Sequence, residues 1–253
     1  MLTTRAERLA TIVGGSGYIL LDFDGPVCSV FANHPAKAVA ADLHELLAQH
    51  GARPPASVWA PGSVWTPADP LEVLRYTATL GRPALTSAVE DALRKAECVA
   101  ARSATPTRYA RKVMMAANES GRRIGIVSNN SEEAISAYLV KHDLAGRVHT
   151  VVGRPHSDPG RMKPHPAPLL LALRRLGAVP EQAFLVGDSV SDIEASDAAG
   201  LAVIGYANKP GKSTRLASAD VVITSMGELA MVLRSSSAQL RRGSRWSPSR
   251  RGC

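Results

Sequence analysis

Short apolar runs recur along the chain, and most are separated by stretches with helical spacing. The runs show little polar alternation, which predicts strands that are buried on both faces of a parallel sheet. They are Tyr18–Phe23, Arg123–Ser128, Val148–Val152, Ala183–Gly187, Leu201–Tyr206 and Ala219–Thr224. Helices are predicted at 106–119, 131–142, 166–176 and 191–199. This alternation predicts an α/β fold whose core is a Rossmann-like parallel sheet with right-handed crossovers.

The alternation is interrupted between residues 32 and 104. This segment has three helical patterns, at 35–49, 70–80 and 87–101, joined by loops rich in proline and glycine, and no strand is predicted in it. We therefore expect residues 1–31 and 105–233 to form one core. Residues 32–104 are expected to form a helical unit inserted after the first strand.

Composition describes an ordinary globular chain with a basic end. Hydrophobic residues make up 45% of the 253 positions, and no run reaches the roughly eighteen apolar residues of a membrane-spanning helix. Six of the arginines behind the net charge of +8 lie in residues 234–253, which contain no acid, so +2 remains for the rest. We expect this basic tail to be disordered. The basicity belongs to the tail, which argues against nucleic-acid binding by the core.

The cysteines and the N-terminus give no sign of export. Cys28, Cys98 and Cys253 lie far apart and form neither a CxxC motif nor a disulfide framework. The apolar run at 18–21 is too short for a signal peptide. We expect a cytoplasmic protein that acts as a monomer or dimer.

Polar residues gather after several predicted strands, at the carboxyl ends where open parallel sheets bind ligands. They are Asp22, Asp24, Ser128, Asn129, Asn130, Asp188 and Asp192, and Lys163 precedes a predicted helix. Carboxylates gathered in this way repel one another unless a cation lies among them, and an all-oxygen ligand set favours Mg²⁺. A phosphate group would balance the cation and the lysine. The pattern predicts phosphoryl transfer to an attacking carboxylate, with a second carboxylate moving the proton.

These residues also resemble a known family. The segments DFDGPV, SNN, MKPHP and GDSVSD resemble, in the same order, the four motifs of the haloacid dehalogenase (HAD) superfamily. The resemblance covers about residues 18–233, and residues 32–104 resemble its α-helical (C1) cap. It implies a Mg²⁺-dependent, phosphoglycolate-phosphatase-like enzyme. Such an enzyme hydrolyses a small phosphorylated metabolite through an aspartyl-phosphate.

The resemblance implies roles for individual catalytic and phosphate-binding residues. Asp22 would be the nucleophile, and Asp24 would protonate the leaving oxygen and then activate water. Ser128, Asn129 and Lys163 would form the phosphate site, with Lys163 also steadying the charge of the nucleophile. Because superfamily members that cleave carbon–halogen bonds lack an acid at the position of Asp24, its presence favours a phosphatase.

The resemblance also implies a metal site. Asp22, the backbone carbonyl of Asp24 and Asp188 would hold Mg²⁺, with Asp192 acting on it directly or through water. One residue departs from the pattern, because Pro26 stands where threonine is usual. Proline fixes φ and removes the hydroxyl, so we expect a stiffer loop with the metal ligands intact.

Two other functions fit the same motifs. A phosphosugar mutase would return the phosphoryl group to its substrate, and a binding module would hold a phosphorylated ligand without turnover. In the inserted unit, candidates for substrate contact are His34, Lys37, Trp59, Trp65 and Arg75.

Overall fold

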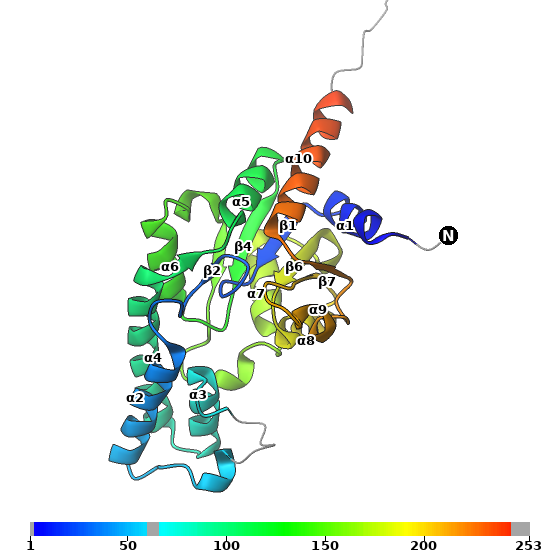
Figure 1. Cartoon of the computed structure of the whole chain (residues 1–253). Helices are drawn as coiled ribbons and strands as arrows, with labels where there is room; N and C mark the ends of the chain where they lie inside the picture. Colours follow the sequence, from blue (N-terminus) through cyan, green and yellow to red (C-terminus); the bar gives the residue numbers. More distant parts are fainter. Residues whose placement is uncertain (1–2, 60–65, 244–253) are drawn as a thin grey trace, which may run out of the picture.

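The computed structural model describes residues 3–59 and 66–243 (Figure 1). Its main sheet has six parallel strands in the order β5-β4-β1-β6-β7-β8. These strands are β1 (Tyr18–Leu21), β4 (Arg123–Val127), β5 (Thr150–Val152), β6 (Ala183–Gly187), β7 (Ala202–Tyr206) and β8 (Val221–Ile223). All six lie within the apolar runs of the sequence, so the predicted α/β fold and its parallel sheet are confirmed.

Helices cover both faces of the sheet. One face carries α1 (Arg5–Gly14), α5 (Ala110–Glu119), α6 (Glu132–Lys141) and α10 (Met226–Gly243), and the other carries α7 (Ala167–Leu176) and α8 (Val190–Ala199). In β1, Ile19 and Leu21 pack in the first of these two layers and Leu20 packs in the second. A strand buried on both sides has no polar face, which explains its unbroken apolar sequence.

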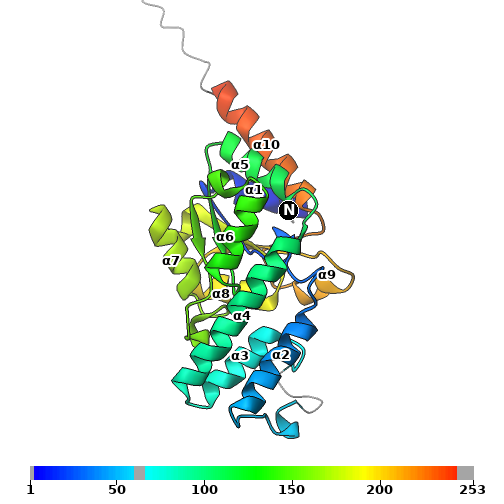
Figure 2. The ribbon, with the colours of Figure 1, turned by 90° about the vertical axis from the view of Figure 1, so that its left-hand side faces the viewer.

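The inserted segment forms three helices that lie beyond one end of the sheet (Figures 1 and 2). They are α2 (Ala36–Gln49), α3 (Pro70–Thr79) and α4 (Pro83–Ser103), and they share a separate apolar cluster that includes Val39, Val73 and Val89. The last turns of α4 instead pack, through Ala100 and Ala101, into the apolar layer that contains α1, α5, α6 and α10. The three predicted helices are confirmed, and the domain boundaries drawn around them stay a prediction.

The chain enters and leaves this segment through two paired connections. The short strands β2 (Cys28–Ser29) and β3 (Thr105–Pro106) form an antiparallel two-stranded sheet. The Asn33 side chain adds a hydrogen bond of 2.7 Å to the Ser103 carbonyl. The two connections are therefore held together directly beside the end of β1.

Both ends of the described chain contain more helix than the sequence analysis expected. Helix α1 begins at a capping box between Thr4 and Glu7. Helix α10 continues to Gly243, which corrects the expected disorder over residues 234–243; the rest of that tail lies outside the described residues. Ser235 and Ser236 donate to carbonyls of the preceding turn, so this serine run is compatible with a helix.

Short helical turns complete the described structure. The turns are η1 (Ala56–Trp59), η2 (Ala145–Arg147), η3 (Pro159–Arg161), η4 (Pro180–Gln182) and α9 (Lys212–Arg215). Across residues 3–59 and 66–243, no helix combines the length and apolar character needed to cross a bilayer.

Candidate active site

Asp22 lies at the end of the strand β1, in the middle of the sheet. Its backbone N–H donates to the Val186 carbonyl at 2.9 Å, so pairing with β6 continues one residue past the strand. The chain then turns tightly, and an Asp24 carboxylate oxygen accepts from the Val30 N–H at 2.9 Å. Asp22 is buried, whereas Asp24 is partly exposed. The turn thus places two carboxyl groups at the sheet edge in different environments.

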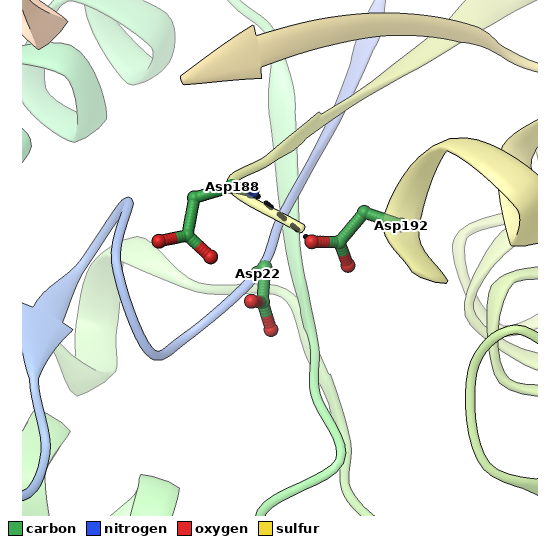
Figure 3. A group of neighbouring side chains, drawn as sticks. All are labelled: Asp22, Asp188 and Asp192. Carbon is green, nitrogen blue, oxygen red and sulfur yellow. Dashed lines mark hydrogen bonds between the residues drawn. The ribbon is translucent and has the colours of Figure 1, made fainter. Parts of the chain in front are cut away.

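Three carboxylates meet at this edge (Figure 3). Oxygen atoms of Asp22, Asp188 and Asp192 lie within 4.8 Å of one another. Asp188 follows β6, and Asp192 lies in the first turn of α8. The neighbouring strands β1 and β6 therefore bring together three of the four predicted metal-site residues. The carboxylate of the fourth, Asp24, is not part of this group.

Lys163 bridges two of these carboxylates. Its Nζ lies 2.9 Å from Oδ1 of Asp22, 2.5 Å from Oδ1 of Asp192 and 3.1 Å from the Val127 carbonyl. The lysine side chain is only 2% exposed. Burial alone would lower the pKa of Lys163, but Asp192 and Asp22 raise it above its usual value. The ammonium group therefore stays charged against the carboxylate of Asp22.

Asp192 and Asp188 are held by different donors. Oδ2 of Asp192 accepts from the backbone N–H of Asp188 at 3.1 Å and from the N–H and hydroxyl of Ser189 at 3.0 and 2.6 Å. Both oxygens of Asp192 are thus engaged within the chain. Asp188 accepts from the Asn208 amide at 3.0 Å and pairs with Lys212. Sequence reasoning missed Asn208 and Lys212, although both follow β7 at the same sheet edge.

Three carboxyl groups at this edge, those of Asp22, Asp24 and Asp188, have pKa values above their usual range. Burial raises the pKa of Asp22 to about 7; Asp192 and Asp188 add to this shift, and Lys163 opposes it. Burial also raises the pKa of Asp24, against the hydrogen bond from Val30, and that of Asp188, against Lys212. The chain alone therefore leaves the Asp22 carboxyl group only partly ionised near neutral pH.

The loop after β4 holds the predicted phosphate-binding residues. The Ser128 hydroxyl lies 3.2 Å from the side-chain oxygen of Asn130. The Asn129 amide donates to the Lys163 carbonyl at 3.0 Å, and its oxygen accepts from the Lys163 N–H at 2.9 Å. Asn129 therefore holds the lysine-bearing segment in place. Its predicted contact with phosphate stays a prediction.

These groups face a cavity of about 510 Å³ between the core and the inserted helices. Its core lining includes Asp22, Asp24, Ser128, Asn129, Lys163 and Asp188, and the helices add Glu72, Arg75, Leu93 and Glu97. Of the five candidates for substrate contact, only Arg75 lines this cavity among the residues described. Its guanidinium donates to the Lys163 carbonyl at 2.8 Å and to Glu72 at 2.5 Å. Trp65 and the Trp59 side chain lie outside the described parts.

Sequence reasoning also missed a group of charged residues beside the loop that follows β4. Arg154, after β5, pairs with Glu90 and Glu97 of α4, and all three side chains are fully buried. The two glutamates are seven positions apart, which places them on one face of the helix. That spacing was visible in the sequence, but charged residues on a helix are usually exposed.

Comparisons with known proteins place part of the chain among curated relatives. It is 38% identical over 120 residues to phosphoglycolate phosphatase of Salmonella choleraesuis (strain SC-B67), with 47% of each chain covered. The corresponding protein of Escherichia coli (strain K12) is 36% identical over 115 residues, with 45% of each chain covered. The chain thus spans about half the length of the curated relatives it matches.

Solved structures resemble this chain over most of its length. The structure of CbbY from Rhodobacter sphaeroides in complex with phosphate superposes with a TM-score of 0.63 at 18% identity, covering 85% of this chain and 96% of that one. A HAD-superfamily hydrolase from Geobacter sulfurreducens gives a TM-score of 0.52 at 22% identity, covering 87% and 97%. At these identities the likeness shows the shared fold. Residues 76–206, about half of the sequence, match the family model of haloacid dehalogenase-like hydrolases. The chain belongs to this family.

Proposed function

We propose that this protein is a Mg²⁺-dependent phosphatase that hydrolyses a small phosphomonoester through an aspartyl-phosphate. The observation that carries the proposal is the Asp22–Lys163 ion pair of 2.9 Å at the wall of the cavity. It joins a nucleophile and a phosphate-binding cation in one place. The phosphoglycolate phosphatases among the relatives support the same activity. The cavity volume of about 510 Å³ suits a small substrate.

The residues supply each step of such a reaction. An oxygen of Asp22 attacks phosphorus and forms an O–P bond while the bond from phosphorus to the leaving oxygen breaks. Asp24 donates its proton to that oxygen, and its raised pKa helps it to carry the proton. Asp24 then takes a proton from water, which attacks phosphorus and releases Asp22. Ser128 and Lys163 bind the phosphoryl oxygens during both steps.

The residues at the sheet edge fit a divalent cation. Three carboxylates contribute oxygens within 4.8 Å of one another, and a hard cation such as Mg²⁺ prefers oxygen ligands. Asp22, Asp188 and the backbone carbonyl of Asp24 would hold it. Asp192 would act on the cation indirectly, by holding Lys163 and the Asp188 backbone in place, because its oxygens already accept from Lys163, Asp188 and Ser189. When bound, the cation would neutralise negative charge on the phosphoryl oxygens.

Gly25 lets the turn after β1 approach Asp188 closely. Its φ is +115°, and a Cβ at this position would lie 2.4 Å from Cγ of Asp188. Any larger residue must therefore move the Asp188 carboxylate or the turn. Gly121 provides a contrast, because its φ is +75° but no atom lies within 4 Å of its would-be Cβ.

The substitution Gly25→Ala is expected to weaken Mg²⁺ binding. Both Gly25→Ala and Gly121→Ala strain the backbone, so each should lower the free energy of unfolding by about 1 kcal/mol or more. Only Gly25→Ala displaces a proposed metal ligand. Calorimetric titration with Mg²⁺ should show weaker binding for Gly25→Ala and unchanged binding for Gly121→Ala. Equal affinities in the two variants would contradict the metal site.

Mg²⁺ affinity should depend on pH around the pKa of Asp22, which is about 7 without metal. Below this pKa a proton occupies the carboxylate, and the cation must displace it; above it the ligand is free. The apparent affinity should therefore rise about tenfold from pH 6 to pH 8, with proton release on binding at the lower pH. The same titration in two buffers of different ionisation enthalpy measures that release. A pH-independent affinity without proton release would contradict a role for Asp22 as ligand.

The substitution Asp22→Asn should abolish phosphatase activity. The amide keeps the shape of the side chain but is a far weaker nucleophile, so release of p-nitrophenol from p-nitrophenyl phosphate with Mg²⁺ should stop. Asp197→Asn, at an exposed position of α8, is the matched control and should leave the rate unchanged. Thermal unfolding establishes that both variants are folded. Undiminished turnover by Asp22→Asn would refute the proposal, and release of inorganic phosphate distinguishes hydrolysis from mutase chemistry.

A further inference from the structure

A fully buried ionic cluster joins α4 to the core beside the cavity. The Arg154 guanidinium donates to each carboxylate oxygen of Glu90 at 2.9 Å. It also donates to the two carboxylate oxygens of Glu97, at 2.8 and 3.2 Å. The side chains of all three residues have 0% exposure. Burial alone would lower the pKa of Arg154, but Glu97 and Glu90 raise it, so the guanidinium stays charged.

Such a cluster is a costly way to attach a helix. Removing charges from water is unfavourable, and well-packed apolar side chains often stabilise a fold equally well. Unlike apolar packing, the cluster also fixes the positions of its members, because charge-assisted hydrogen bonds require a defined geometry. The residues that it contacts therefore indicate its role.

Glu97 holds the loop that carries Ser128. Its Oε1 accepts from the Asn130 amide at 3.1 Å, and its Oε2 accepts from the Ser131 N–H at 2.9 Å. The side-chain oxygen of Asn130 in turn accepts from the Ser128 hydroxyl at 3.2 Å. One residue thus separates Glu97 from the hydroxyl that is proposed to bind the phosphoryl group.

Arg154 holds the same loop from its other side. Its guanidinium donates to the Asn129 carbonyl at 2.6 Å, and its backbone N–H donates to the Asn130 carbonyl at 2.9 Å. Asn129 makes the two hydrogen bonds to the backbone of Lys163. The preceding Gly153 permits this close approach, because a Cβ there would lie 2.3 Å from the backbone nitrogen of Glu132.

We propose that Glu97 and Arg154 are positioning residues for phosphoryl transfer. Through Asn130 and Asn129 they fix the Ser128 hydroxyl and the segment that carries Lys163. Glu90 neutralises and anchors Arg154 and lies 3.8 Å from Arg94, and it makes no hydrogen bond or ion pair with the loop at residues 128–131 within the described structure. The kinetic part of this proposal rests on the proposed phosphatase function.

Two matched substitutions separate positioning from stability. Glu90→Gln and Glu97→Gln each remove one carboxylate from a buried Arg154, so both should lower the melting temperature. In Glu97→Gln either orientation of the amide places an NH₂ group against donors, because each oxygen of Glu97 accepts from Arg154 and from the loop. Only this variant disturbs the loop directly.

The expected result is a difference between the variants in two measurements. With p-nitrophenyl phosphate and Mg²⁺, Glu97→Gln should lower kcat about tenfold or more, whereas Glu90→Gln should stay within about twofold of wild type. Amide hydrogen exchange at residues 128–131 should become about tenfold faster in Glu97→Gln only. Exchange in β6 reports global opening and should change equally in both. If Glu97→Gln does not fold, Glu97→Asp and Glu90→Asp replace the pair, with the same expected difference.

The two measurements distinguish a failure of the positioning role from a failure of the proposed phosphatase function. Similar exchange at 128–131 and similar kcat in both variants would overturn the positioning role and leave the cluster a purely structural anchor. A wild-type protein without phosphatase activity would refute the proposed function. The exchange comparison would then still decide whether Glu97 orders the loop.

Discussion

The site depends on a buried ammonium group held between two carboxylates. Lys163 lies 2.9 Å from Asp22 and 2.5 Å from Asp192, and its side chain is 2% exposed. Each group would be unfavourable if it were buried alone, and together they compensate one another. The pairing holds Asp22 and Lys163 together at the wall of the cavity, where we propose that a phosphoryl group binds. The neighbouring elements supply the hydrogen bonds that keep this arrangement in place.

The sheet brings these residues together, and the loops orient them. Asp22 and Asp188 follow the adjacent strands β1 and β6, so parallel pairing alone places them side by side. Lys163 comes from a loop that the side-chain amide of Asn129 holds through two hydrogen bonds to the Lys163 backbone. The inserted helices close the cavity from the other side, where Arg75 contacts the Lys163 carbonyl. The geometry of the proposed active site therefore depends on both parts of the chain.

Sequence patterns predicted the sheet and much of the site because both follow from local rules. Strands buried on both faces need unbroken apolar runs, and polar residues after them lie at one edge. The buried partners of Arg154 could not be predicted in this way. Glu90 and Glu97 lie 64 and 57 positions before it, and their burial depends on how α4 packs against the core. The helix at the serine-rich end of α10 was also not predicted, because composition alone favoured disorder there. Composition does not show that the Ser235 and Ser236 hydroxyls can donate to carbonyls of the preceding helical turn.

The most direct test of the account is to identify the residue that becomes phosphorylated. Asp24→Asn should slow hydrolysis of the intermediate, because the general base for water is lost. After this variant is mixed with p-nitrophenyl phosphate and Mg²⁺ and quenched in acid, peptide mapping by mass spectrometry should find a phosphoryl group on Asp22. Phosphate release without modification of Asp22, or modification of another residue, would contradict the account.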